Sequence, residues 1–262
     1  MSRQRWILII LIILIGVIGV GWYYVSQPEA YDTIAIIKQR GTLRVGLDAS
    51  FPPFETMTAK GEIVGLDVEI AHDIATTLGV KLQLVNIGFD GLYDALLADQ
   101  VDMVISGLPY DPRWTEDVAY SSTYFNAGQL LLVRVDEANL IHAEALHNQQ
   151  IAVEWGSEAD MVGRQLLKKQ PALTLVRQET AAQTVEMLLN QQVDGAIVDG
   201  VTGLSALPRG VKIVGYLTDE WYVVAVVLDS QDLLALINER LALMQETKQL
   251  DDIIARWLHA LP

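Results

Sequence analysis

Two stretches of the chain repeat one pattern at a fixed offset. Residues 96–105 read LLADQVDMVI, and residues 188–197, which lie 92 positions later, read LLNQQVDGAI. In each stretch an amphipathic helix pattern ends in a Gln-Val-Asp turn and runs into a short apolar strand. The repetition predicts two lobes of related α/β design.

The surrounding sequence alternates strand and helix patterns. A short helix is predicted over residues 33–40, a strand over 42–47, a helix over 68–78 that ends at Gly79, and a strand over 80–85. This alternation is typical of α/β layers with mostly parallel strands. Ligands of such sheets bind beyond the carboxyl ends of the strands, where Ser106-Gly107 and Asp199-Gly200 are expected. Two such edges facing one another would form a cleft.

Composition excludes several classes of protein. Of the 262 residues 51% are hydrophobic, which is enough for a sizeable core and argues against disorder. The net charge of −15 repels phosphate backbones, so we expect no nucleic-acid partner. The chain has no cysteine, which excludes disulfide frameworks, thiolate zinc sites and cysteine nucleophiles.

The N-terminal region predicts a membrane anchor. Arg3 and Arg5 precede an unbroken apolar run over residues 6–25, and 20 helical residues span roughly the 30 Å of a bilayer core. Cations ahead of the run place the N-terminus in the cytoplasm and the rest of the chain outside. A cleaved signal peptide is the alternative, but the run is long for a signal core and no Ala-x-Ala site follows it. Residues 26–32 are the expected linker.

Several motifs in a fixed order resemble one family. Residues 43–55 (LRVGLDASFPPFE), 61–71 (GEIVGLDVEIA), 105–108 (ISGL) and 120–125 (YSSTYF) are similar to the bacterial family 3 extracellular solute-binding proteins. Residues 233–258 resemble the closing helices of that family. The resemblance implies an α/β, two-lobed periplasmic-binding-protein-like fold (type II), here preceded by one N-terminal transmembrane helix. Lobe 1 would comprise residues 33–126 and 219–262, and lobe 2 residues 127–218, with crossing strands near 129–134 and 221–226.

The resemblance also implies a function. The chain would be a membrane-anchored, extracytoplasmic substrate-binding protein, at the cell surface or in the periplasm. It would capture a small polar solute, foremost an amino acid, and deliver it to an ABC permease. We expect a monomer, no cofactor and no enzymatic activity.

Matches to the family place one half of the ligand site in lobe 2. Asp199 matches the carboxylate that pairs with the ligand's α-ammonium group, and the alternative is an N-cap of the next helix. Gly156-Ser157 matches the helix start that receives the ligand carboxylate. The alternative is a capping box in which Ser157 caps the helix together with Asp160.

The other half is expected in lobe 1. Phe51 and Phe89 resemble the walls around the ligand side chain, although either could be core. Asp48 matches the position that faces the far end of basic ligands, and its alternative is a strand-end aspartate bonded to the following loop. The segment after the next strand would offer a hydroxyl and backbone groups to the ligand: Ser106, Gly107 and Leu108.

Departures from the family bear on the ligand. Pro109 replaces a hydroxyl residue, and Trp114 stands where the family has the arginine that clamps the ligand carboxylate. The nearest candidate for the clamp is Arg113, displaced by one residue. Glu158 adds a negative charge near the expected carboxylate end. Two ligands follow as alternatives: an amino acid held by Arg113, or a cationic amine without a carboxylate.

An enzyme is the remaining alternative, because some proteins of this fold resemble cyclohexadienyl or arogenate dehydratases. Carboxylates near the expected cleft could supply a general acid, namely Asp48, Glu55, Glu154 and Glu158. The sequence shows no Ser-His-Asp order, HExxH or phosphate loop. The acidic pairs at residues 219–220 and 251–252 lack further ligands at coordination spacing, so no metal site is expected.

Overall fold

The computed structural model describes residues 32–137, 146 and 148–259. The predicted membrane span over residues 6–25, and residues 26–31 of the linker, lie outside this part of the chain. Among the described residues, no helix combines the length and apolarity needed to cross a membrane. The chain divides into Met1–Asp32 and Thr33–Pro262, and the description below concerns the second unit.

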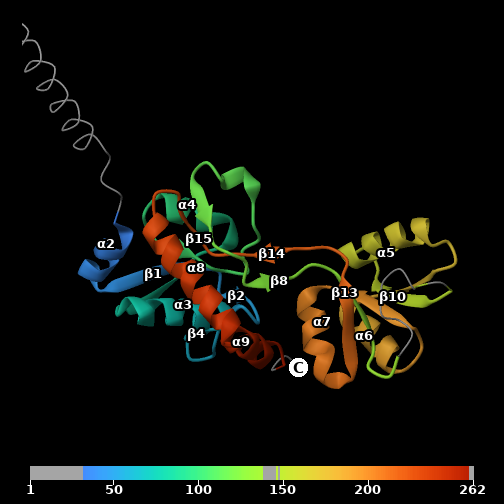
Figure 1. The fold of residues 1–262 in the computed structure, drawn as a ribbon. Helices are drawn as coiled ribbons and strands as arrows, with labels where there is room; N and C mark the ends of the chain where they lie inside the picture. The colour runs from blue at the N-terminus through green and yellow to red at the C-terminus, as the bar shows by residue number, and fades with distance from the viewer. Residues whose placement is uncertain (1–31, 138–145, 147, 260–262) are drawn as a thin grey trace, which may run out of the picture. The chain divides into compact units, whose positions relative to one another are not determined.

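The first five-stranded sheet has β1 (Thr42–Leu47) between β5 (Lys81–Asn86) and β6 (Met103–Val104), and these three strands are parallel. Next to β6 lies β15 (Ala225–Val227), which is antiparallel and is followed by β7 (Val118–Tyr120) at the edge. Figure 1 shows this sheet with the helices around it. Because β15 comes from the far end of the sequence, the sheet is built from two separate segments of the chain.

Helices cover both faces of this sheet, and Leu43 and Val45 of β1 are buried in the core on one face. One face packs against α2 (Thr33–Arg40), α3 (Leu66–Leu78), α8 (Gln231–Glu246) and α9 (Gln249–Leu258), and the other against α4 (Leu92–Leu97). A small sheet and two short helices complete the region: β2 (Ser50–Phe51), β3 (Glu55–Met57), β4 (Ile63–Val64), η1 (Phe89–Gly91) and η2 (Pro112–Trp114).

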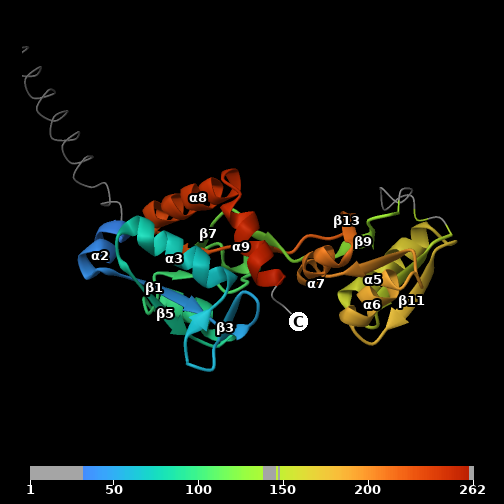
Figure 2. The same ribbon diagram turned by 90° about the horizontal axis from the view of Figure 1, so that it is seen from below.

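The second sheet repeats the order of the first. Strand β10 (Gln150–Glu154) lies between β11 (Thr174–Gln178) and β12 (Gly195–Val198), again all parallel. The antiparallel β9 (Leu130–Arg134) comes next, and β13 (Val211–Tyr216) forms the edge. Its two faces carry separate cores, one under α5 (Glu158–Lys169) and one under α6 (Ala181–Leu189) and α7 (Gly200–Ala206), which runs on into η4 (Leu207–Arg209). Figure 2 shows these helices from a second direction.

The predicted repeat is confirmed down to single hydrogen bonds. In the first copy the Asp102 carboxylate accepts the backbone N–H of Arg44 (2.7 Å), and in the second the Asp194 carboxylate accepts that of Gln150 (2.8 Å). Asp99 and Gln191, which are equivalent in the repeat, both adopt left-handed backbone angles with φ of 54° and 59°. The Gln-Val-Asp turn therefore closes the helix and fastens the next strand to its neighbour in both copies.

Two backbone segments connect the lobes. Strands β8 (Phe125–Asn126) and β14 (Trp221–Tyr222) pair antiparallel, and the Ala127 N–H donates to the Glu220 carbonyl (2.8 Å). The predicted crossing strand at 221–226 contains β14, but its partner β8 lies before the predicted 129–134. Strand β9 instead enters the second sheet and β15 the first, each as the fourth strand. Gly128 sits where a Cβ would come within 2.2 Å of the Thr218 carbonyl, so the two segments need a glycine to run this close.

Candidate functional site

A pocket of about 330 Å³ opens at the carboxyl end of β1 and β6. Its walls are aromatic: Phe51 and Phe89 are 42% and 43% exposed, and Tyr222 enters from β14. Phe51 stacks on the buried Phe54, with ring centroids 5.3 Å apart, so the core holds this wall in place. The remaining lining residues are Asp48, Ser50, Gly107 and Pro109.

Asp48 fixes the two loops that carry these walls. One carboxylate oxygen accepts the Ser50 hydroxyl (2.7 Å), and the other accepts the backbone N–H of Phe89 (2.9 Å). The predicted alternative, a strand-end aspartate bonded to the following loop, is therefore present. Asp48 also lines the pocket, so the same carboxylate contributes negative charge beside the aromatic rings.

The segment after β6 forms the floor of the pocket, with most of its polar groups already used. The Ser106 hydroxyl is fully buried, donates to Glu55 Oε1 (2.7 Å) and accepts the Asp48 N–H (2.9 Å). The Gly107 N–H donates to Asp67 (2.6 Å). Leu108 is buried in the core and its carbonyl accepts the Val223 N–H. These groups hold the floor, and neither the Ser106 hydroxyl proton nor the Gly107 N–H points to a ligand.

Two buried carboxyl groups lie beneath this floor. Glu55 and Asp67 have no exposed surface. Burial raises the pKa of Glu55 to about 10, with the Asp67 charge adding to the shift. Burial also raises the pKa of Asp67, to about 6, against hydrogen bonds from Gly107 and Tyr124 that lower it.

In the second lobe, Gly156 and Ser157 connect β10 to α5. Gly156 has a φ of +77°, and the Ser157 side chain caps the helix by accepting the Asp160 N–H. The capping alternative is therefore present. The Gly156 N–H donates to the Asp160 carboxylate (3.2 Å), which is 1% exposed and also binds Arg164 and Arg177. The Arg164 hydrogen bond is the main reason that the pKa of Asp160 falls to about 2.

Asp199 follows β12, the parallel neighbour of β10, so both segments lie at one edge of the sheet. Its carboxylate caps α7 by accepting the N–H and hydroxyl of Thr202, at 2.9 and 2.6 Å. Burial raises the pKa of Glu220, and the negative charges of Glu158 and Asp199 add to this shift. The carboxylates of Glu158 and Asp199 thus each lie close enough to Glu220 to disfavour its ionised form.

Arg113 lies apart from these groups, in η2. Its side chain is 84% exposed and binds the carboxylate of Asp111 at 2.5 Å, and the guanidinium lowers the pKa of that carboxyl group. It does not line the pocket at Phe51 and Phe89.

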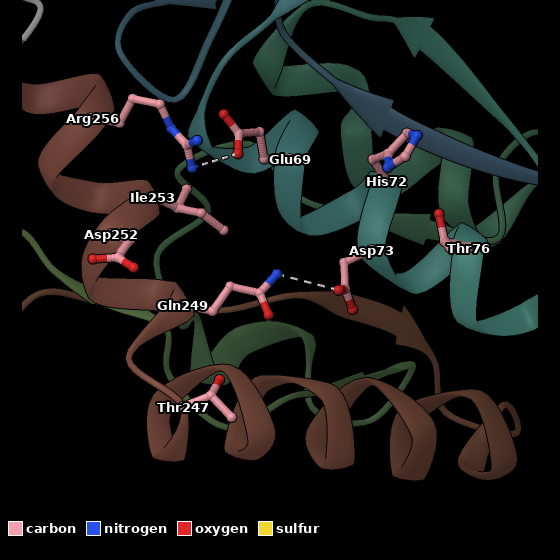
Figure 3. Close-up of a pocket in the computed structure, with 9 residues that line it drawn as sticks. All are labelled: Glu69, His72, Asp73, Thr76, Thr247, Gln249, Asp252, Ile253 and Arg256. Atoms are coloured by element: carbon pink, nitrogen blue, oxygen red, sulfur yellow. Dashed lines mark hydrogen bonds and ion pairs between the residues drawn. The ribbon is translucent and has the colours of Figure 1, made fainter.

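A larger hollow of about 750 Å³ lies between α3 and the last two helices. Figure 3 shows Arg256 reaching Glu69 (3.0 Å) and Gln249 reaching Asp73 (3.4 Å) across it. Arg240 also binds Asp73, at 2.8 Å. Glu69 and Asp73 are thus paired with side chains of α8 and α9, which joins α3 to these two helices across the hollow.

The sequence analysis did not single out two aromatic residues near the expected ligand site. Tyr222 lines the pocket from β14, and Trp155, directly before Gly156, is 72% exposed. In the sequence, Trp155 stands next to the motif glycine Gly156, and Tyr222 lies inside an apolar crossing segment. Aromatic residues in such positions belong to the core more often than to a binding site. Among the residues that the structure describes, no three acidic or histidine side chains gather as metal ligands would.

Comparison with known proteins bears on this geometry. The family model of bacterial extracellular solute-binding proteins, family 3, matches residues 43–260. The L-cystine-binding protein TcyJ of Escherichia coli K12 is 26% identical over 86% of this chain and 85% of its own length. The arginine-binding extracellular protein ArtP of Bacillus subtilis 168 is 24% identical over 82% of this chain and 85% of its own. A solved ancestral cationic amino acid solute binding protein (AncCDT-1) is 29% identical, with a TM-score of 0.65, over 87% of this chain and all of its own.

Proposed function

Because the chain belongs to the bacterial extracellular solute-binding proteins, family 3, we propose that it captures an amino acid between its lobes and delivers it to an ABC-type importer. The pocket of Phe51, Phe89 and Tyr222 is the observation that carries this proposal. It lies beyond the carboxyl ends of parallel strands, where α/β sheets bind ligands. The exposed rings of Phe51 and Phe89 suit an alkyl or guanidinium group better than a strongly hydrated one.

We propose further that the ligand is cationic. The charges of Glu158 and Asp199 disfavour the ionised form of Glu220, and a cation placed beside Glu220 would relieve that repulsion. Asp48 adds a fourth negative charge at the aromatic pocket. The names of ArtP and AncCDT-1 give arginine and cationic amino acids as the ligands of those proteins, which supports the same class here.

The proposed ligand contacts divide between the lobes. Phe51, Phe89, Asp48 and the floor at Gly107 would hold the side chain of the ligand, and Asp199 its α-ammonium group. The lobes are proposed as residues 33–126 with 219–262, and 127–218. The family consists of extracellular solute-binding proteins, so the folded part lies outside the cytoplasm. We propose that residues 6–25 anchor it to the membrane.

Thermal unfolding tests the proposal. The full chain, purified in a mild detergent and dialysed free of bound solutes, is melted with each amino acid and with small amines. A ligand at 100 times its Kd adds about 2.7 kcal/mol, which raises the melting temperature by roughly 5–10 °C. A shift with L-arginine or L-lysine is expected. No shift with any amino acid contradicts the proposed function.

A cationic amine without a carboxylate is the second candidate, favoured by the pairing of Arg113 with Asp111. The substitution Arg113→Ala separates the two. If Arg113 leaves Asp111 to clamp a ligand carboxylate, the variant loses affinity for L-arginine by roughly tenfold or more. Unchanged affinity for L-arginine rejects the clamp, and affinity only for amines such as agmatine supports the second candidate. Calorimetric titration of both ligands provides the measurement, with Arg209→Ala as a control on the surface.

Catalysis is not part of the proposal. Glu55, whose pKa is raised in the manner of a general acid, is fully buried and bonded to Ser106. It does not line the pocket that a substrate would occupy.

A further inference from the structure

The carboxyl groups of Glu55 and Asp67 lie close together beneath the pocket floor, where the Asp67 charge raises the pKa of Glu55 and the Glu55 side chain lowers that of Asp67. Glu55 belongs to β3 and Asp67 to the first turn of α3, and neither side chain has exposed surface. A pair of ionised carboxylates in such a place would repel strongly. Their arrangement therefore needs a proton.

Counting the four oxygens locates that proton. Glu55 Oε1 accepts the Ser106 hydroxyl (2.7 Å), while Asp67 Oδ2 accepts both the Gly107 N–H (2.6 Å) and the Tyr124 hydroxyl (2.9 Å). The other two oxygens, Glu55 Oε2 and Asp67 Oδ1, are buried and have no donor among the described residues. One proton held between them satisfies both atoms, and a buried polar atom without a partner is costly.

The neighbours decide which residue carries the proton. Asp67 receives two hydrogen bonds from other groups and Glu55 receives one. Donors stabilise the anionic form of a carboxyl group, so the negative charge belongs on Asp67 and the proton on Glu55.

Short chains of hydrogen bonds connect the Glu55–Asp67 pair to the floor and walls of the pocket. Asp67 fixes Gly107, where an added Cβ would lie 2.6 Å from the Phe51 ring and 3.2 Å from the Tyr222 ring. Glu55 fixes the Ser106 hydroxyl, and that hydroxyl accepts the Asp48 N–H. Asp48 in turn holds the Phe89 loop.

We infer that Glu55 is protonated and donates to Asp67, and that this shared proton positions the aromatic ligand pocket. The inference rests on the proposed function only for the pocket's role, because the proton itself is a property of the unliganded protein. Glu55 is a positioning residue that acts through Ser106 and Asp48.

The charged and titratable groups around the pair set its pH response. Asp48 lies on the far side of Ser106, and Tyr124 and Tyr222 approach from the segments at β8 and β14. The raised pKa of Glu55, about 10, means that the folded protein keeps a proton that the unfolded chain releases near pH 4.5. This contribution to stability is therefore full below about pH 4.5 and is lost as the pH rises toward 10.

Infrared spectroscopy tests the proton without a ligand. Near pH 8 exposed carboxyl groups are ionised, so the carbonyl stretch of a protonated carboxylic acid should come from Glu55. We expect the band to shift when glutamate carboxyls are labelled with ¹³C and to vanish in Glu55→Gln. The full chain in detergent is used, with Glu62→Gln, an exposed acid between β3 and β4, as the matched control. Absence of the band in the wild type, or its survival in Glu55→Gln, overturns the inference.

Two variants test the positioning role. Gln at position 55 can accept from Ser106 and donate to Asp67, so Glu55→Gln should melt within a few degrees of the wild type near pH 6. Its melting temperature relative to the wild type should then rise with pH between about 6 and 10.

Glu55→Ala should lose roughly tenfold or more in affinity for L-arginine, whereas Glu55→Gln should keep the affinity of the wild type. Equal destabilisation by Gln and Ala, or a pH-independent difference, contradicts the inference. If the wild type binds no amino acid, the proposed function fails and the infrared and melting results still decide the proton.

Discussion

At the scale of the residue, Gly107 combines two constraints. Its φ of +48° lies in the left-handed region, and a Cβ there would come within 2.6 Å of the Phe51 ring and 3.2 Å of Tyr222. The pocket floor can therefore pass beneath the aromatic walls only without a side chain.

The substitution Gly107→Ala should weaken ligand binding by roughly tenfold or more, because the new methyl group displaces Phe51 and strains the floor. Calorimetric titration with the solute that raises the melting temperature measures the change. Gly88→Ala is the matched control, since Gly88 has a φ of −59° and open space around it. Equal effects of the two substitutions would show that the floor tolerates a side chain.

Residue identities could be predicted in part. The family motifs assigned Asp48, Phe51, Phe89 and Gly107 to one ligand site, and in the structure all four line one pocket. The uses of Ser106 and Arg113 could not be predicted, because a hydroxyl serves a ligand or a buried acid equally well. Only three-dimensional proximity shows that Ser106 bonds to Glu55 and that Arg113 pairs with Asp111.

At the scale of the element, the start of α5 holds an internal anion. Asp160 accepts the Gly156 N–H and binds Arg164 and Arg177. The helix N-terminus favours this negative charge, so the loop that resembles a carboxylate-binding site is partly filled by its own side chain.

We expect Asp160→Asn to lower the melting temperature by roughly 5 °C at neutral pH, because two arginines lose their carboxylate partner. The lowered pKa of Asp160 means that its contribution is present above pH 3.8 and is lost as the pH falls toward 2. Thermal melts of both proteins along this pH range should therefore converge at the acid end. Glu179→Gln, an exposed acid of the same lobe, serves as the control. A variant as stable as the wild type at neutral pH would contradict this role.

The elements themselves follow closely from local sequence. Gly79 ends α3 with a left-handed φ of 72°, as the sequence predicts. The predicted helix over 68–78 begins two residues earlier, at Leu66, because Gly65 lies too close to the Phe54 carbonyl to carry a side chain and turns the chain there. The segments that cross between the lobes were harder to predict. A short apolar strand has the same sequence pattern whether it joins one sheet or connects two sheets.

At the scale of the whole molecule, the charge of −15 acts on any charged solute. We expect affinity for L-arginine to fall several-fold between about 0.05 M and about 0.5 M salt, because the field of the acidic surface is screened. Affinity for a zwitterionic amino acid should change little over the same range. Titrations of L-arginine and L-cystine at both salt concentrations make the comparison. A salt-independent affinity for L-arginine would argue against a cationic site.

The two-lobed plan could be predicted because the repeat and the family motifs state it in the sequence. The pairing of β8 with β14 could not, since two-residue strands leave no periodic signal. The acid pair beneath the pocket could not be predicted either, because Glu55 and Asp67 come together only when β3 packs against α3.

The discontinuous first sheet also fixes an order of events during synthesis. Every strand of the second sheet lies between Leu130 and Tyr216, so that lobe is complete in the chain once those residues have emerged. The first sheet lacks β15 until the chain has passed Val227, and its core also needs α8 and α9. Thr33 then bonds to Ser230 and Ile34 to Asp232, which joins α2, the first described helix, to the start of α8. The earliest-made half of the protein is therefore the last to finish folding, and its apolar surface depends on protection until the C-terminal helices arrive.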